Sequence, residues 1–311
     1  MHLYDSNLKL ISSFLAHNQS GIERLKQISQ TILASCSFSG SIKFWNTTTI
    51  INGSFKQIME INQSSQIYDV VFLDENIFAL ANPRSIQLFS FVNGLERNLK
   101  NLTINHQTLC LLRFNTSILV SGDDTFKIRL WNVTIKNNKC SNMKCQIGNS
   151  LHGHTSHILD LALVCETRLA SASNDRIVII WDLREFKMLY CLRGHKHKVT
   201  SLRFDVFNFV FLASGSTDGT IKLWNMNEFN SMSKHTLIHG SKSDNGSIYW
   251  SLDFFDKHTL VSGSRNGWIK LWDIRNGGEL IKSFNSTVVL QALSMTYFSM
   301  NTFYLYFCTV F

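Results

Sequence analysis

The sequence predicts an all-β protein built from repeated four-stranded antiparallel sheets. The main observation is the phrase LASGSTDGTIKLWN at residues 212–225, in which two alternating runs flank an Asp-Gly turn. In this phrase and its close or weaker copies the Trp, or Phe in one copy, stands at residues 45, 89, 131, 181, 224 and 272, so the copies recur every 42 to 50 residues. A period of this length indicates an internal structural repeat.

Each repeat unit contains four short runs with the period-two pattern of β-strands. In the fifth unit the first three runs cover residues 199–204, 211–216 and 220–225. A fourth run follows the Trp of each unit, as residues 186–192 do in the fourth unit. A single four-stranded sheet cannot bury both of its faces, whereas sheets arranged radially cover one another and leave few exposed edges. Small residues in the second run suit close approach of neighbouring sheets. We therefore expect one β-propeller domain spanning residues 1–311.

The chain ends predict a seventh blade. Residues 285–311 read as two further strands, and residues 1–16 resemble the end of the sixth unit if Tyr4-Asp5 replaces Trp-Asp. The expected fold is thus a seven-bladed β-propeller, closed by strands from 1–16 and 285–311. One alternative is a membrane-spanning helix, because residues 285–311 carry no charge. Their β-branched and aromatic content favours strands. Another alternative is an incomplete last blade.

The repeat ends carry Trp-Asp or Trp-Asn pairs, and two units also contain Gly-His. These pairs are Gly153-His154 with Trp181-Asp182, Gly194-His195 with Trp224-Asn225, and Trp272-Asp273. In this respect the chain resembles the Trp-Asp (WD) repeat β-propeller family. The resemblance implies a buried hydrogen-bonded network in two units, which satisfies every polar group of the set. Its members would be His154, Ser171, Asp175 and Trp181, and His195, Ser214, Asp218 and Trp224.

The other units depart from this network. Unit six has Asn266 in the Asp position, and unit one offers His17 and Ser39. In unit three Asp124 arrives one residue early, and unit two has Pro83 and no His. We expect these units to form the looser blades.

Composition and motifs argue against catalysis. The formal net charge is +8, with basic residues spread along the chain and densest at residues 193–198. Scattered charge is typical of a solvated surface, so nucleic-acid binding stays a minor alternative. The His-rich runs 152–157 and 194–198 lack accompanying carboxylates or cysteines, and Cys140 and Cys145 lack a second pair. We expect no enzyme activity, no cofactor, no metal and no small-molecule substrate.

The cysteines suggest the compartment. Seven cysteines, an odd number, occur without a secretory signal at the N-terminus. The expected location is the cytoplasm or nucleus.

The expected function is a non-catalytic scaffold, a single propeller that binds other proteins within a multiprotein complex. The resemblance implies that one rim of the propeller binds partner proteins or peptides. It maps that rim to twelve residues, of which about half are expected to contribute to binding. They are Glu23, Gln66, Tyr68, Asn82, Thr108, His157, Asn174, Lys198, Thr200, Ser247, Tyr249 and Arg265.

Two alternative functions accompany the scaffold. The endings Trp-Asp-Leu-Arg184 and Trp-Asp-Ile-Arg275 are similar to the signature of propellers that act as substrate receptors of cullin ubiquitin ligases. That similarity implies that Arg184 and Arg275 pair with carboxylates of a ligase adaptor. The other alternative is an RNA-associated propeller, which would bind polyanions in a strongly salt-dependent way.

Overall fold

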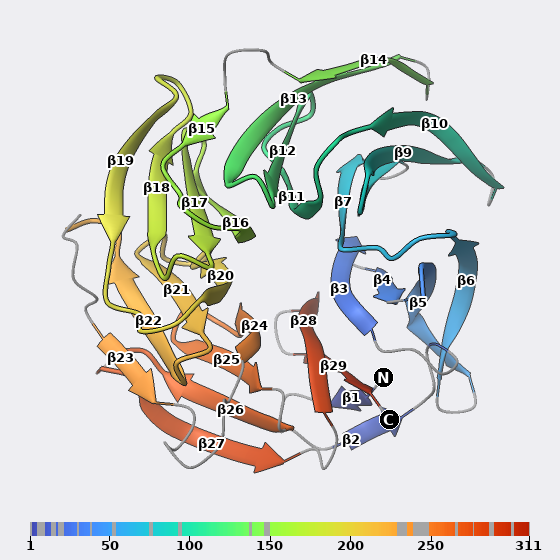
Figure 1. The fold of residues 1–311 in the computed structure, drawn as a ribbon. Helices are drawn as coiled ribbons and strands as arrows, with labels where there is room; N and C mark the ends of the chain where they lie inside the picture. Colours follow the sequence, from blue (N-terminus) through green and yellow to red (C-terminus); the bar gives the residue numbers. More distant parts are fainter. Residues whose placement is uncertain are drawn as a thin grey trace.

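The computed structural model describes most of the chain. The described residues are 2–4, 10–13, 17, 22–29, 31–37, 39–51, 54–74, 77–92, 95–136, 139–145, 150–228, 235–238, 249–264, 267–275, 277–285, 289–299 and 302–310. Within them every regular element is a β-strand, and the strands form a ring of antiparallel sheets (Figure 1). The predicted all-β propeller architecture is confirmed.

Six blades consist of consecutive strands. Blade 1 contains β3 (Ile22–Ser29), β4 (Ile32–Ser37), β5 (Ser41–Ile51) and β6 (Ser54–Asn62). Blade 2 contains β7 (Asp69–Asp74), β8 (Ile77–Asn82), β9 (Ser85–Val92) and β10 (Leu95–Thr103). Blade 3 contains β11 (Thr108–Arg113), β12 (Ile118–Asp123), β13 (Lys127–Lys136) and β14 (Lys139–Cys145), and β13 also pairs with the short β15 (Leu151–His152).

The remaining three blades follow the same order. Blade 4 contains β16 (Ile158–Cys165), β17 (Arg168–Ser173), β18 (Val178–Asp182) and β19 (Lys187–Leu192). Blade 5 contains β20 (Val199–Phe204), β21 (Phe211–Ser216), β22 (Thr220–Asn225) and β23 (His235–Ile238). Blade 6 contains β24 (Tyr249–Phe254), β25 (Thr259–Ser264), β26 (Trp268–Asp273) and β27 (Glu279–Asn285).

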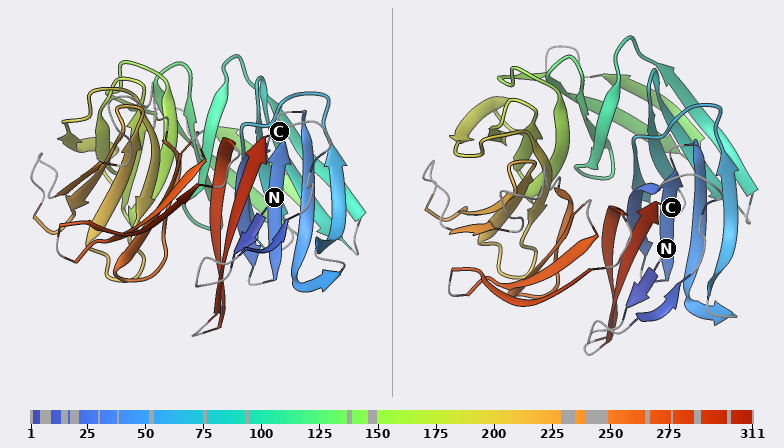
Figure 2. Two further views of the ribbon diagram at one scale, coloured as in Figure 1. Left: turned by 90° about the horizontal axis from the view of Figure 1, so that it is seen from below. Right: turned by 60° about the horizontal axis from the view of Figure 1, so that its bottom comes forward.

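The two chain ends share one further four-stranded sheet, whose strands pair with none of the six repeat blades but contact blades 6 and 1. It contains β28 (Val289–Ser299), β29 (Thr302–Val310), β1 (His2–Tyr4) and β2 (Leu10–Ser13), in the order β2-β1-β29-β28. Strand β1 pairs antiparallel with β29, so that Leu3 lies opposite Tyr306. Strand β28 lies between β24 and β3, and Figure 2 shows both termini on this side of the ring. The C-terminal segment thus forms strands, and no helix among the described residues has the length and hydrophobicity needed to cross a bilayer.

The core lies between neighbouring blades. Between blades 4 and 5, Trp224 packs against Ala170 and Ala172 of β17, together with Leu202 and Leu212 of blade 5. The small second-strand residues allow the two sheets to approach closely, and the indole fills the space between them. Trp224 is only 1% exposed. This arrangement explains why the repeat phrase combines Ala and Ser in one strand with Trp in the next.

Backbone hydrogen bonds distinguish the two faces of the ring. On what we call the top face, the turn between a blade's second and third strands bonds to the loop that enters its first strand. Examples are Asn174 N–H donating to the His157 carbonyl and Thr217 N–H donating to the Lys198 carbonyl. On the bottom face, the turn after the third strand bonds to the turn after the first, as when Leu183 N–H donates to the Thr167 carbonyl.

Candidate interaction faces and their supporting networks

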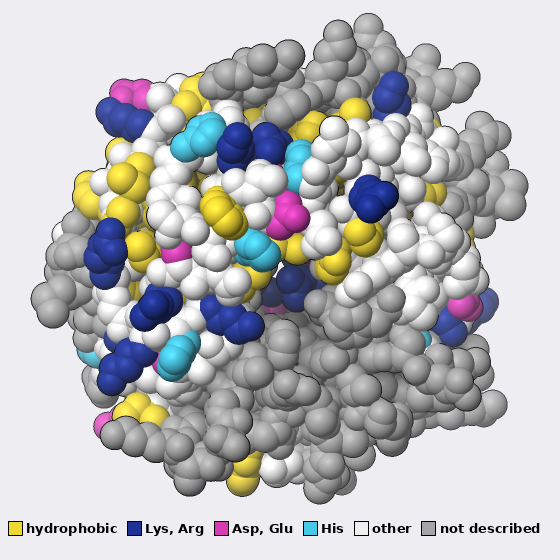
Figure 3. Space-filling view, viewed as in Figure 1, with side chains coloured by type: hydrophobic (Ala, Val, Ile, Leu, Met, Phe, Trp, Pro, Cys, Tyr) yellow, Lys and Arg dark blue, Asp and Glu magenta, His cyan; other side chains and the backbone are white. Residues whose placement is uncertain are grey.

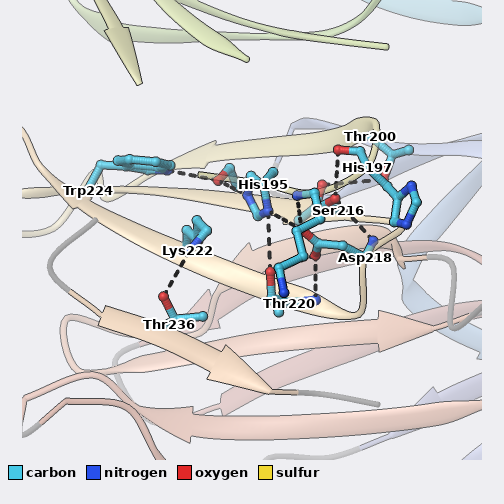
Figure 4. A network of polar contacts seen from close by, with 12 residues as sticks. His195, His197, Thr200, Ser216, Asp218, Thr220, Lys222, Trp224 and Thr236 are labelled. Carbon is cyan, nitrogen blue, oxygen red and sulfur yellow. Dashed lines mark hydrogen bonds and ion pairs between the residues drawn. The ribbon is translucent and has the colours of Figure 1, made fainter. Parts of the chain in front are cut away.

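Blades 4 and 5 each contain the predicted buried network. In blade 4, Trp181 Nε1 donates to Ser171 Oγ at 2.8 Å, and the two ring nitrogens of His154 lie 2.7 Å from Ser171 Oγ and Asp175 Oδ2. In blade 5 the distance from Trp224 Nε1 to Ser214 Oγ is 2.8 Å (Figure 4). Each network links the blade interior to a turn on the top face.

His195 completes the network of blade 5. It lies 2.8 Å from Ser214 Oγ and 3.1 Å from Asp218 Oδ2. The carboxylate of each network also fixes a top-face loop, because Asp175 accepts the Thr155 N–H at 3.0 Å and Asp218 accepts the Lys196 N–H at 2.7 Å.

Electrostatics supports this anchoring role. Burial alone would raise the pKa of Asp175 and of Asp218, but hydrogen bonds to the carboxylates outweigh it and hold both pKa values below the usual value. The donors include His154 for Asp175, and His195 and Thr220 for Asp218. Both carboxylates are therefore ionised and fully engaged with their own blade at neutral pH.

Blade 1 keeps half of the network and changes the rest. Trp45 Nε1 donates to Ser35 Oγ at 2.8 Å, and His17 Nε2 lies 2.8 Å from the same hydroxyl. The other ring nitrogen lies 2.6 Å from Ser41 Oγ, whereas Ser39, the expected partner, is hydrogen-bonded to Ser37 at 2.7 Å. The two ring nitrogens of His17 thus bond to hydroxyls, where those of His154 and His195 bond to one hydroxyl and one carboxylate.

Blade 3 contains a charged cluster that sequence reasoning missed. Trp131 donates to Ser121 at 2.8 Å as in the other blades, but the fully buried acid is Asp123. Arg129 Nε lies 2.8 Å from Asp123 Oδ2, and the guanidinium also donates to His106 Nε2 at 3.1 Å. The sequence signal for this cluster was Arg129, a basic residue within a strand that follows the consecutive aspartates Asp123 and Asp124.

Asp124 keeps the anchoring role that Asp175 and Asp218 have in their blades. It accepts the Gln107 N–H at 3.0 Å and so holds the entering loop of blade 3. Close by, a cavity of about 390 Å³ opens between blades 2 and 3. Its lining includes Arg84, His106 and Asp124.

Blades 2 and 6 show two further outcomes. In blade 6 the Trp–Ser contact persists, with Trp272 Nε1 donating to Ser262 Oγ at 2.8 Å. In blade 2 the polar set is replaced by apolar residues, because Leu80 and Phe89 are both buried and Phe89 stacks on Phe78 at 5.3 Å between ring centroids. Replacing the hydroxyl and the indole together leaves neither of these two groups without a partner. Asn266 of blade 6 lies outside the described residues.

The predicted rim residues fall into three groups. His157 and Lys198 are exposed, and Gln66, Tyr68, Asn174 and Thr200 are half-buried. Asn82 and Thr108 are 2% and 0% exposed, so they are wrongly assigned to a partner-binding surface. The remaining four rim positions lie outside the described residues or have side chains outside them: Glu23, Ser247, Tyr249 and Arg265.

The two Trp-Asp-x-Arg arginines lie on the bottom face. Arg184 is exposed and follows β18, where Asp182 Oδ1 accepts its backbone N–H at 2.7 Å. Arg275 follows β26, and its guanidinium pairs with the carboxylate of Asp273 two residues earlier. Both arginines are accessible, but Arg275 is already paired within its own turn.

An exposed apolar loop lies on the same face, between these arginines, in blade 5. Val206, Phe207 and Phe209 are all substantially exposed. The buried Asp205 carboxylate accepts the Phe207 and Asn208 N–H groups and so fixes the loop. Among the described residues no group of three His, Cys, Asp or Glu side chains could hold a metal ion.

Comparison with known proteins identifies the repeat. The family described as WD domain, G-beta repeat matches residues 145–182, 186–225 and 233–273. The chain is 31% identical over 118 residues to WD-40 repeat-containing protein MSI3 of Arabidopsis thaliana, covering 36% of this chain and 26% of the relative. It is 27% identical over 214 residues to WD repeat-containing protein 26 homolog of the same plant, covering 67% and 34%.

A third relative shows a shorter match. CCR4-associated factor 4 of Saccharomyces cerevisiae is 37% identical over 76 residues, covering 24% of this chain and 12% of the relative. The matches therefore span from about an eighth to a third of the length of these three relatives.

Proposed function

Because this chain is a WD-repeat protein, we propose that it acts as a non-catalytic scaffold that binds other proteins or peptides through its top face. The observation that carries the proposal is the anchoring of top-face loops by aspartate carboxylates. Asp124, Asp175 and Asp218 each accept the N–H of a loop residue in their own blade. Such anchoring keeps the loop surface pre-organised, which lowers the entropic cost of binding a partner.

The proposal treats the Ser–His–Asp sets as structural. Ser171 and Ser214 are fully buried, and each hydroxyl already bonds to an indole and an imidazole. A nucleophile needs access to a substrate carbonyl, and neither hydroxyl has it. We further propose a single propeller in the cytoplasm or nucleus, a reducing setting that suits the unpaired thiols of Cys110, Cys165 and Cys191.

We also propose that the sheet of the two chain ends serves as a seventh blade. Its support is the pairing of β1 with β29 and the position of β28 between β3 and β24. If the sheet closes the ring, backbone amides of Leu3 and Tyr306 will exchange with deuterium as slowly as those of the repeat blades. Exchange within seconds at these amides, with slow exchange in β17 and β21, would show that the ends open independently.

A second candidate function uses the bottom face. The exposed Arg184 and the fixed apolar loop at Val206–Phe209 favour a docking contact there, in addition to the top face. In this candidate the chain is a substrate receptor of a cullin ubiquitin ligase, with Arg184 and Arg275 contacting carboxylates of the adaptor. The apolar loop would supply the buried centre of that contact.

One comparison of three baits tests both candidates. The parent chain, a top-face variant (His157→Ala with Lys198→Ala) and a bottom-face variant (Arg184→Ala with Arg275→Ala) are purified with bound proteins and compared quantitatively. We expect the top-face variant to lose most partners by about tenfold or more, and the bottom-face variant to lose a ligase adaptor selectively. Each variant removes two exposed side chains and is the control for the other.

The outcomes separate the two functions. If the top-face variant retains every partner of the parent chain, the proposed scaffold face is wrong. If no adaptor binds the parent chain, or if adaptor binding survives the loss of both arginines, the ligase candidate is wrong.

A further inference from the structure

We propose that the top face over blades 3 to 5 binds an acidic peptide segment, with Phe126 and His157 at the centre of the contact. This inference rests on the proposed scaffold function and names the class of partner for its top face. It depends on the charge of four short segments, on the hydrogen bonds that their acidic groups already make within the protein, and on one exposed aromatic ring.

Over blades 4 and 5 the exposed charges on this face are all of one sign, and blade 3 adds the half-buried Asp124, whose carboxylate accepts the Gln107 N–H. In segments 152–157, 174–177, 193–198 and 217–219, the exposed basic and imidazole side chains are His152, His157, Arg176, Arg193, Lys196, His197 and Lys198. The only acids in these segments are Asp175 and Asp218, and their carboxylates bond to His154 and His195 and to backbone N–H groups. Figure 3 shows dark-blue and cyan side chains spread over this part of the face, with little magenta.

Four cations on this face have no ion-pair partner among the described residues. Arg176, Arg193, Lys196 and Lys198 make no ion pair with any residue that the structure describes. Burial lowers the pKa of Lys222, and the charge of Lys196 lowers it further. Like charges held close together on pre-organised loops attract an anionic partner, because its carboxylates relieve their mutual repulsion.

Phe126 supplies an apolar contact within this charged region. The residue lies in the top-face turn of blade 3 and adopts a φ of 68°, in the left-handed region that disfavours bulky side chains. The equivalent turn in blade 5 has Gly219 there, with a φ of 87°. Phe126 is 39% exposed, and its ring stacks on the His157 imidazole of blade 4, with 5.7 Å between centroids.

A strained, exposed aromatic residue at the junction of two blades is more consistent with a binding contact than with a stabilising one. Truncation of such a ring, surrounded by polar groups, is a common way to lose binding energy at protein interfaces. The fitting partner therefore combines several carboxylates with one apolar side chain that covers the Phe126 ring.

The same features favour a peptide over single-stranded nucleic acid. Proteins that bind single strands stack successive bases on several aromatic side chains. In the described top-face segments 104–108, 123–127, 152–157, 174–177, 193–198 and 217–219, Phe126 is the only Phe, Tyr or Trp. One ring can cover one apolar side chain, but it cannot form a track for consecutive bases.

Fluorescence anisotropy with defined probes tests the inference. The probes are a 12-residue peptide of Glu and Gly with a central Leu pair, the same peptide with Gly in place of Leu, its Lys counterpart, and a 12-nucleotide oligouridine. The variants are Lys196→Glu with Lys198→Glu, and Phe126→Gly. The control, Lys56→Glu with Lys100→Glu, changes the net charge equally at exposed positions of the outer strands β6 and β10.

We expect the Leu-containing acidic peptide to bind the parent chain and to lose affinity about tenfold or more in the Lys196/Lys198 variant. The Lys56/Lys100 variant should keep at least half of the parent affinity. Phe126→Gly should weaken only the Leu-containing probe, with an unfolding midpoint equal to or above that of the parent, because Gly readily adopts positive φ. The Lys counterpart should not bind.

Three outcomes overturn the inference. These are equal losses in the two Lys double variants, no effect of Phe126→Gly on the Leu-containing probe, and tighter binding of oligouridine with the same sensitivity to substitution. If none of the acidic probes binds while the top-face bait variant still loses its partners, the scaffold function stands and the acidic class of partner is wrong.

Discussion

Replacement of Ser214 by Ala is expected to lower the free energy of unfolding by about 3 kcal/mol. The hydroxyl accepts the Trp224 indole N–H at 2.8 Å and bonds to His195 Nε2 at 2.8 Å. Both partners are buried, so the substitution leaves two polar groups without partners in the blade interior. Each orphaned buried group costs about 1–3 kcal/mol. Urea denaturation of the parent and the variant measures the difference.

Blade 2 provides the matched control for this prediction. There Leu80 and Phe89 occupy the Ser and Trp positions, so the acceptor and the donor are absent together. Combining Ser214→Ala with Trp224→Phe removes the orphaned indole N–H, and part of the loss should be recovered, by about 1 kcal/mol relative to additivity. A single Ser214→Ala variant that loses less than about 1 kcal/mol, or a strictly additive double variant, would contradict the orphan-group argument.

The networks of blades 4 and 5 were predictable because the family motif supplies all four members at fixed offsets in the sequence. The substitutes in other blades were not. His17 turns to Ser41 rather than Ser39, and Arg129 bonds to Asp123 from a position on β13. Such contacts depend on which side chain reaches the vacated space, and that is a property of three-dimensional packing rather than of spacing.

The misassigned rim residues have a physical cause in strand register. In blade 3 the Asp124 N–H donates to the Gln107 carbonyl, as the Asn174 N–H donates to that of His157. Gln107 is therefore the equivalent of His157, and Thr108 is the next residue along the strand. Because successive side chains of a strand point to opposite faces, an error of one residue turns a surface position into a buried one. Thr108 is accordingly fully buried.

Lowering the pH from 6.5 to 4 is expected to reduce the free energy of unfolding by about 3 kcal/mol through His17 alone. Burial, together with the Lys43 cation, lowers the pKa of this imidazole from 6.5 to about 4. Between these pH values the unfolded chain binds a proton that the folded chain does not. The stabilising effect is therefore complete above pH 6.5 and is lost progressively as the pH falls toward 4.

Burial is the main reason for this low pKa, and among the described residues no carboxylate accepts a hydrogen bond from His17, whereas His154 and His195 each bond to an aspartate. A urea-denaturation series across the pH range should show a flatter slope between pH 6.5 and 4 for His17→Gln than for the parent chain.

The control for this series is His106. Burial and the Arg129 cation also lower its pKa, so it contributes in the same direction and is removed in a parallel His106→Gln variant. Asp175 and Asp218 have lowered pKa values, so their contributions are lost only below about pH 4 and do not overlap this range. Ser39→Asp should place a carboxylate at the position that corresponds to Asp218 and raise the pKa of His17, so that the loss of stability between pH 6.5 and 4 becomes smaller, because the folded chain then also binds the proton. An unchanged slope in His17→Gln would assign the pH dependence to other groups.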